Sequence, residues 1–140
     1  MYLLDTDHLS LLERGGEGTQ PLLSRLAAIE PDKAGVTIIS YEEQTRDWFS
    51  FMAKARTIEA QIKAYRQLQQ HLQIFCAVPI VAFDERAAGT FQSLQRQGLR
   101  IGTMDLKIAA IALARDATLL TRNLSDFNLI AGLRAEDWSS

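Results

Sequence analysis

The sequence has few of the residues that mark secreted or histidine-dependent proteins. Its 140 residues include one cysteine and two histidines. The single thiol of Cys76 cannot close an internal disulfide, and its apolar neighbours predict a buried side chain in a reducing compartment. His8 and His71 are too few and too far apart to act as a paired acid and base. We expect His8 at the surface or at the edge of a site, and His71 on a solvated helix face.

Long apolar runs are also absent. No stretch approaches the roughly 18 apolar residues that a membrane span needs, and the first residues do not resemble a signal peptide. We therefore expect a soluble, cytoplasmic protein with no membrane partner. Fifteen basic and 17 acidic residues give a net charge of -2, which argues against a surface that binds phosphate everywhere. The length and the 47% of apolar residues favour one domain over residues 1–140.

Short apolar runs recur along the chain and alternate with helical patterns. A run without polar alternation is typical of a strand that is buried on both faces of a parallel sheet. Each run is followed by a polar residue and then by a helical pattern, as in βαβ units. The runs are Tyr2–Leu4, Val36–Ile39, Val78–Val81, Leu99–Ile101 and Thr118–Thr121.

The segments between these runs predict helices. Residues 56–75 place apolar side chains at helical spacing, and residues 104–113 are apolar almost all round, so the second of these helices should be central. Further helices are expected at 19–29 and at 84–97, the latter with Asp84 as its N-cap. The fold class that follows is α/β, with three α/β/α layers around a central, mainly parallel sheet.

Acidic residues follow the expected strands at the end where parallel sheets bind ligands. Asp5, Glu43, Asp105 and Asp126 stand at or shortly after such ends, and ligands of open parallel sheets bind beyond the carboxyl ends of the strands. Carboxylates that are brought together repel one another unless a cation neutralises them. Hard oxygen ligands select Mg²⁺ or Mn²⁺. The pattern therefore favours a shared metal site.

Each acid also has an explanation that involves helix capping alone. The segment from Ser40 to Glu43 matches a capping box, in which the glutamate would bond the backbone N–H of Ser40. Asp105 would complement a helix dipole, and both Asp126 and Asp5 would cap short helices. Independent caps do not explain why the acids coincide at strand ends, so the metal site is the preferred interpretation.

Four stretches carry these acids together with their neighbours. They are Met1–Asp7, Thr37–Gln44, Gly102–Ala110 and Leu120–Phe127. The stretches resemble the four motifs of PIN-domain ribonucleases, and they are most similar to those of VapC-type toxins. The resemblance spans nearly the whole chain. It is most specific in the aspartate followed by Leu-x-Ile-Ala-Ala and in the Leu-Thr-Arg-Asn run.

The resemblance implies a role for each matching residue. It makes Asp5, Glu43 and Asp105 catalytic metal ligands, and it gives the fourth place in this set to Asp126 or to Asn123. Residues that would contact the substrate or orient the carboxylates are Thr6, Ser40, Asn123, Arg122, Lys107 and Arg46.

The sequence offers further acids close to these candidate ligands. Glu43 is preferred to Glu42 because its spacing from Ser40 fits the family pattern, and because adjacent helical residues point about 100° apart. Many members of the family carry Asn where this chain has Asp7, and Gly where it has Asp47. The roles of these two aspartates are therefore undecided.

The activity that the resemblance implies is hydrolysis of RNA by a water activated on Mg²⁺ or Mn²⁺. The protein would be the toxin of a toxin–antitoxin pair. The side chains of Trp48, Phe51 and Met52 are more apolar surface than one helix face buries in a monomer. The resemblance suggests that they form part of a groove for the antitoxin and that the protein is a homodimer; the alternative is that Trp48 and Met52 pack in the core. Trp138 is expected to be a packing anchor.

Two other α/β classes share the clustered acids. A haloacid-dehalogenase-like phosphatase would use Asp5 as nucleophile and Asp7 as acid, but Leu9 stands where Thr or Val is required and no suitable lysine follows. A receiver-like module, which is not an enzyme, would need an aspartate and a lysine where Glu43 and Arg122 stand. The nuclease is the preferred function.

Overall fold

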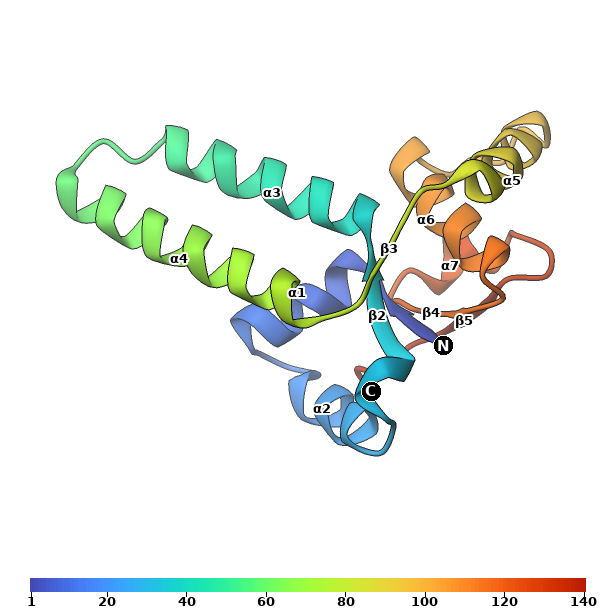
Figure 1. Cartoon of the computed structure of the whole chain (residues 1–140), viewed down its shortest axis with the longest axis horizontal. Coiled ribbons are helices and arrows are strands. Elements are labelled where there is room, and N and C mark those ends of the chain that lie inside the picture. Colours follow the sequence, from blue (N-terminus) through green and yellow to red (C-terminus); the bar gives the residue numbers. More distant parts are fainter.

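A parallel, five-stranded sheet runs through the centre of the computed structural model, which describes residues 1–140 (Figure 1). The strand order is β3-β2-β1-β4-β5, and every neighbouring pair is parallel. The chain starts in the middle of the sheet, builds one half outward and then returns to β1 to build the other half. The strands are β1 Tyr2–Leu4, β2 Ala34–Thr37, β3 Ile80–Val81, β4 Thr118–Leu120 and β5 Arg134–Glu136.

Seven α-helices and one 3-10 helix connect the strands. Helices α3 and α4 form a long hairpin that extends away from the sheet, whereas α5, α6 and α7 lie on the opposite side of the molecule (Figure 1). None of the helices is both long and apolar enough to span a lipid bilayer. The helices are α1 Thr6–Arg14, α2 Thr19–Ala27, η1 Pro31–Lys33, α3 Ile38–Ala53, α4 Ile58–Ala77, α5 Glu85–Arg96, α6 Thr103–Ala114 and α7 Leu124–Phe127.

Each face of the sheet has its own hydrophobic core. Leu3 and Leu119 belong to a cluster that includes much of α5 and α6. Their neighbours Leu4 and Leu120 point the other way and pack with residues of α1, α2 and α4. All of these leucines are buried. Burial on both faces explains why the central strands have no polar alternation, and it confirms the predicted three-layer fold.

Helix α6 is the most deeply buried helix. The side chains from Ile108 to Ala112 have no exposed surface. The small alanines of this helix let it approach its neighbours closely, because the distance between packed helices depends on the side chains at their contact. The prediction of a central helix at 104–113 is confirmed, and so is Asp84 as the N-cap of α5, since its Oδ1 accepts from the backbone N–H of Ala87 at 3.0 Å.

One predicted strand is wrong and one strand was missed. Residues 99–101 form no strand; Leu99 and Ile101 instead pack against the core from the link between α5 and α6. The fifth strand is β5, with the sequence Arg-Ala-Glu. Strand β5 lies at the edge of the sheet and is largely exposed, so it has no need of the apolar run that marks the central strands.

Strand β2 ends earlier than predicted. Thr37 is the N-cap of α3, and its side chain accepts a hydrogen bond from the backbone N–H of Ser40 at 3.1 Å. Ile38 and Ile39 are therefore helical, although their branched side chains favour strands. The alternative explanation, in which Ser40 and Glu43 form a capping box, is wrong because the N-cap lies three residues before Ser40.

Three further side chains are placed differently from the sequence prediction. Cys76 is exposed, because α4 continues past it and turns the adjacent Phe75 inward instead. His8 and His71 are buried, since the imidazole of each one bonds a carboxylate of α1. The prediction for Trp138 is confirmed, because this side chain is buried and belongs to the second core.

Replacing Leu119 with alanine should lower the free energy of unfolding by about 2–5 kcal/mol, because it opens a cavity at a fully buried position. Leu129 is 54% exposed and gives a matched control. Leu129→Ala should change the free energy of unfolding by less than about 0.5 kcal/mol. Urea denaturation followed by circular dichroism measures both variants, and equal losses would contradict the placement of Leu119 in the core.

Candidate functional site

The strand order reverses between β1 and β4. Helix α1 leaves β1 toward one core, while α7 follows β4 toward the other. Divergent connections of this kind open a crevice beyond the carboxyl ends of the two strands, where open α/β sheets bind ligands. Asp5 directly follows β1, and Thr121 directly follows β4. The first of the predicted acids therefore lies where the topology favours a ligand.

Asp5 is held at this point by bonds to the end of β4 and to the start of α1. Its backbone N–H donates to the carbonyl oxygen of Leu120 at 2.8 Å. Its Oδ2 accepts from the hydroxyl of Thr121 at 2.9 Å, and its Oδ1 accepts from the backbone N–H of Thr6 at 2.8 Å. Asp5 is the N-cap of α1, as the capping explanation predicts. It is also buried, at 5% exposure, which an ordinary cap at a helix start does not require.

Glu43 reaches the same place from α3. Its Oε1 accepts from the hydroxyl of Thr6 at 2.9 Å, and the Ser40 hydroxyl lies 3.4 Å from the same Thr6 oxygen. Glu42 instead pairs with Arg46 on the exposed side of the helix. The structure thus brings Glu43, and not Glu42, next to the residue that follows Asp5.

Asp105 and Asp126 approach from the other core. Asp105 lies in the first turn of α6, and Asp126 lies in the short helix α7. The side-chain amide of Asn123 donates to Oδ2 of Asp126 at 3.0 Å. This bond places the two candidates for the fourth position next to each other, with Asn123 orienting the Asp126 carboxylate.

Burial and mutual repulsion raise the pKa values of three of these acids. Burial is the main cause for Asp5, whose pKa rises to about 7, and the charges of Asp7 and Asp105 add to the rise. Burial also raises the pKa of Glu43, as does the charge of Asp105. The pKa of Asp105 is raised by burial and then by the charges of Asp126 and Asp7. These acids share one electrostatic environment that disfavours their combined charge.

The donor set fits a hard divalent cation by its chemistry. The candidate ligands Asp5, Glu43, Asp105 and Asp126 offer carboxylate oxygens only, and a cation among them would offset both their repulsion and the cost of burial. The site is not a preformed cage, because no three His, Cys, Asp or Glu side chains lie close enough together to hold an ion. A cation bound by these residues would therefore have to draw the carboxylates inward.

The chain matches the PIN domain family over residues 2–133. It belongs to this family. Ribonuclease VapC1 of Haemophilus influenzae strain R2866 is 26% identical over 140 residues, which cover 99% of this chain and 98% of that protein. The tRNA(fMet)-specific endonuclease VapC of Shigella flexneri is 44% identical over 66 residues, which cover 44% of this chain and 50% of that protein.

The fold of this PIN domain is similar to that of VapBC-1 from nontypeable Haemophilus influenzae. The TM-score is 0.76 at 23% identity, over 99% of this chain and 98% of that one. This likeness confirms the PIN-like architecture expected from the sequence. The family match over nearly the whole chain also decides against the phosphatase and the receiver-like module.

Asp7 of the PIN domain lies beside the four acids, but both of its carboxylate oxygens already have partners. Oδ1 lies 3.0 Å from Nδ1 of His8, and Oδ2 accepts from the backbone N–H of Arg122 at 3.0 Å. The carboxylate is still close enough to raise the pKa values of Asp5 and Asp105. Asp7 therefore adds negative charge to the site without taking part in its hydrogen bonds.

The guanidinium of Arg122 contacts the protein rather than the crevice. It donates to the carbonyl oxygen of Glu17 at 2.8 Å and to the hydroxyl of Ser139 at 2.9 Å. These bonds join the loop before α2 to the segment after β5. The motif pattern predicted that this side chain contacts phosphate. In the structure its guanidinium instead bonds groups of the protein itself.

The other two basic residues of the motifs also have partners. The ammonium of Lys107 lies 5.9 Å from the ring centre of Phe83 and 5.7 Å from that of Phe91. Arg46 pairs with Glu42 at the exposed surface. A surface pair of this kind contributes little stability, so Arg46 can exchange its partner for a phosphate at small cost.

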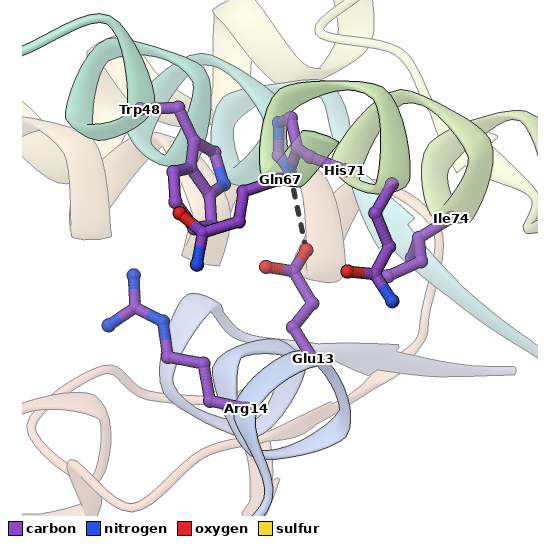
Figure 2. Close-up of a pocket in the computed structure, with 7 residues that line it drawn as sticks. Glu13, Arg14, Trp48, Gln67, His71 and Ile74 are labelled. Atoms are coloured by element: carbon purple, nitrogen blue, oxygen red, sulfur yellow. Dashed lines mark hydrogen bonds and ion pairs between the residues drawn. The ribbon is translucent and has the colours of Figure 1, made fainter. Parts of the chain in front are cut away.

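A separate hollow of about 250 Å³ lies between α1, α3 and α4 (Figure 2). None of the four acids lines it. In this hollow Nδ1 of His71 lies 3.3 Å from Oε1 of Glu13, while Nε2 lies 3.0 Å from the hydroxyl of Thr45. The guanidinium of Arg14 lies 5.5 Å from the ring centre of Trp48. The sequence pattern gave no sign of Glu13, because its partner is 58 residues away.

In metal-free protein, the free energy of unfolding should fall as the pH rises from about 4 to about 7. The folded chain holds the Asp5 proton more tightly than the unfolded chain, because burial raises the pKa from 3.8 to about 7. The stabilisation is complete below the unfolded pKa and is lost as the pH rises through the folded one. Asp5→Asn should flatten this slope. Above pH 7 its free energy of unfolding should exceed that of the wild-type protein by at most about 4 kcal/mol.

Urea titrations in EDTA over this pH range measure the slope. The exposed Asp32 provides the control, and Asp32→Asn should keep the slope of the wild-type protein. A slope that persists in Asp5→Asn would show that the other acids, and not Asp5, dominate the pH dependence.

Proposed function

We propose that this PIN domain is an endoribonuclease that depends on Mg²⁺ or Mn²⁺ and is the toxin of a VapBC-type toxin–antitoxin pair. The observation that carries the proposal is the approach of Asp5, Glu43 and Asp105 from three different elements to one environment, in which the charge of Asp105 acts on both of the other acids. Without a cation these carboxylates repel one another, and a divalent cation among them would offset this repulsion. The names of the relatives, Ribonuclease VapC1 and tRNA(fMet)-specific endonuclease VapC, support RNA as the substrate.

Asp5, Glu43, Asp105 and Asp126 are the residues that would hold the cation. When bound there, a divalent ion would supply a lowered pKa to a coordinated water and offset negative charge on the phosphodiester. The chain has no need of a side-chain nucleophile for this reaction.

Neutral side chains of this protein orient the acids. The hydroxyl of Thr6 donates to Glu43, and the hydroxyl of Thr121 donates to Asp5. The contact with Thr6 fixes one oxygen of Glu43 and leaves the other available, whereas both oxygens of Asp5 are oriented, one by the Thr121 hydroxyl and one by the backbone N–H of Thr6. Orientation by a second layer of hydrogen bonds supports both the affinity of a metal site and its geometry.

The histidines are not available as acid or base. Both ring nitrogens of His8 have partners, and so do both ring nitrogens of His71. The carboxylates therefore remain the groups that can carry the chemistry.

Transfer RNA is the first substrate to test, because the segment that matches the tRNA(fMet)-specific endonuclease is 44% identical. Such a substrate places the activity in the cytoplasm. Arg46 is the basic residue that we expect to meet its backbone, since its exposed pairing with Glu42 is readily exchanged.

Purified wild-type protein should cleave RNA in the presence of Mg²⁺ or Mn²⁺ and lose this activity in EDTA. Asp5→Asn and Asp105→Asn should each lower the rate by at least about a hundredfold, because each removes a ligand from the site. Electrophoresis of a total RNA pool and of an initiator tRNA transcript measures the cleavage.

The matched control for these variants is Asp32→Asn, which removes an exposed carboxylate of η1 and should leave the rate unchanged. Cleavage in EDTA, or full activity of both Asp5→Asn and Asp105→Asn, would refute the proposal. Restoration of activity after EDTA by added Mn²⁺ excludes damage to the protein as the cause of a loss.

The hairpin of α3 and α4 is the proposed partner surface. Phe51 is 45% exposed, and Trp48 contacts it edge to face with ring centres 5.9 Å apart. Met52 lines a shallow hollow together with Phe49 and Tyr65, which are both exposed. We propose that an antitoxin segment covers this apolar surface in a homodimer of the protein.

Phe51→Glu should weaken binding of the antitoxin by about tenfold or more, because a charge replaces an exposed aromatic anchor. RNA cleavage by the free protein should be unchanged. Ser50→Glu is the control, since it adds the same charge at an adjacent exposed position of α3. Calorimetry with the product of a small reading frame next to the gene measures binding, and sedimentation measures the dimer. Equal binding by both variants and the wild type would contradict this placement.

A further inference from the structure

His8 is fully buried in the first half of α1, and the proposed chemistry does not use it. Its Nδ1 lies 3.0 Å from Oδ1 of Asp7. Its Nε2 lies 3.1 Å from the backbone nitrogen of Trp138. A backbone N–H can only donate, so Nε2 must accept, and the proton of a neutral ring must then be on Nδ1, where it donates to Asp7. The contacts of His8 select one tautomer.

Asp137 does not compete for the same ring nitrogen. Its Oδ1 is 3.5 Å from Nε2 of His8, but this oxygen accepts from both the backbone N–H and the hydroxyl of Ser139. A second proton on Nε2 would face the N–H of Trp138. The bond from the Trp138 N–H to Nε2 is therefore the one that a ring with its proton on Nδ1 can accept.

The segment that bonds His8 is firmly attached to the domain. The Trp138 ring packs against Tyr2 of β1 with ring centres 4.7 Å apart, and the guanidinium of Arg25 lies 5.9 Å from its centre. Trp138 is buried. The N–H that His8 accepts is consequently in a fixed position.

Arg122 fastens the same segment from the other side. Its guanidinium bonds the Ser139 hydroxyl, and the close approach depends on Gly18. A Cβ at Gly18 would lie 2.5 Å from Nη2 of Arg122 and 2.8 Å from the backbone oxygen of Ser139. With φ of 95°, this position also favours glycine by its backbone conformation.

His8 and Arg122 both hold Asp7. The ring of His8 bonds one carboxylate oxygen, and the backbone N–H of Arg122 bonds the other. The Asp7 side chain is 34% exposed, so without these bonds it could turn toward solvent and away from Asp5 and Asp105. Two contacts that depend on residues 137–139 thus hold a charged group beside the acids.

We propose that His8 is a positioning residue that, together with the Arg122 backbone, holds the Asp7 carboxylate beside the four acids and thereby strengthens the binding of a divalent cation. The inference rests on the proposed function, because it presupposes that the acids bind such an ion. A carboxylate fixed near a cation attracts it through space without being its ligand. Residues that orient the groups around a metal commonly change its affinity by 10- to 100-fold.

Two substitutions of His8 separate its two bonds. The amide nitrogen of Asn lies near the position of Nδ1, so His8→Asn keeps a donor for Asp7 and loses the bond to Trp138. The amide of Gln lies near the position of Nε2, so His8→Gln keeps a partner for Trp138 and loses the donor. Calorimetric titration with Mn²⁺ should show about a tenfold weaker affinity for His8→Gln and a change of less than about threefold for His8→Asn.

His71→Gln is the matched control. His71 is a second buried histidine that bonds a carboxylate of α1, but its partner Glu13 lies in the hollow away from the four acids (Figure 2). His71→Gln should lower the melting temperature while leaving the Mn²⁺ affinity within about twofold of the wild type. If His8→Gln and His71→Gln weaken Mn²⁺ binding equally, general loosening explains the effect and the positioning role is refuted.

The tautomer gives a second readout that needs no metal. Nitrogen-15 spectra of the imidazoles in EDTA should show a neutral His8 ring with its proton on Nδ1. Trp138→Pro removes the N–H that faces Nε2, and it should change this signature and weaken Mn²⁺ binding more than Trp138→Ala, which keeps the N–H. A ring with its proton on Nε2 in the wild type would overturn the inference.

The two proposals fail in different ways. A wild-type protein that binds no Mn²⁺ refutes the metal-dependent function, while the imidazole signature still decides whether His8 links Asp7 to Trp138. A wild-type protein that binds Mn²⁺ with the same affinity as His8→Gln refutes only the positioning role.

Discussion

Repulsion between half-buried and buried carboxylates is the constraint on which the rest of this structure depends. Burial raises the pKa values of Asp5, Glu43 and Asp105, and the charge of Asp105 raises the pKa values of the other two further. Hydroxyl and backbone donors offset part of this cost, as the bonds of Thr6 and Thr121 show. A fold that keeps such a group together concentrates unfavourable electrostatics at one place, and pKa values perturbed in this way cluster at functional sites.

The two hydrophobic cores stabilise the fold against this electrostatic repulsion. Alternate residues of β1 and β4 are buried in opposite cores, so the two strands that carry the site are fixed on both faces. Helix α6 is almost entirely buried and brings Asp105 to the crevice on a rigid support. The acids come from separate elements, and each element is anchored by apolar contacts at a distance from the charges. Stability and chemistry therefore occupy different parts of the domain.

Residues near the C-terminus contact the elements that carry the site. Trp138 packs on β1 and bonds His8, and Arg122 connects Ser139 to the loop before α2. The hollow between α1, α3 and α4 repeats this use of a buried histidine with Glu13 and Thr45 (Figure 2). Helix α1 thus carries a histidine–carboxylate contact near each of its ends, and only one of the two lies beside the acids.

The sequence by itself determined the α/β class, the central strands, the buried helix α6 and the acids of the PIN motifs, because apolar period and motif spacing are local properties. Only the tertiary structure decided that β5 completes the sheet, that Thr37 rather than Ser40 caps α3, and that His8 and His71 are buried. These features depend on partners far away in the chain, as in the bond between His8 and Trp138 across 130 residues. A local pattern can show that a side chain is polar, but whether it is buried depends on which partners folding brings to it.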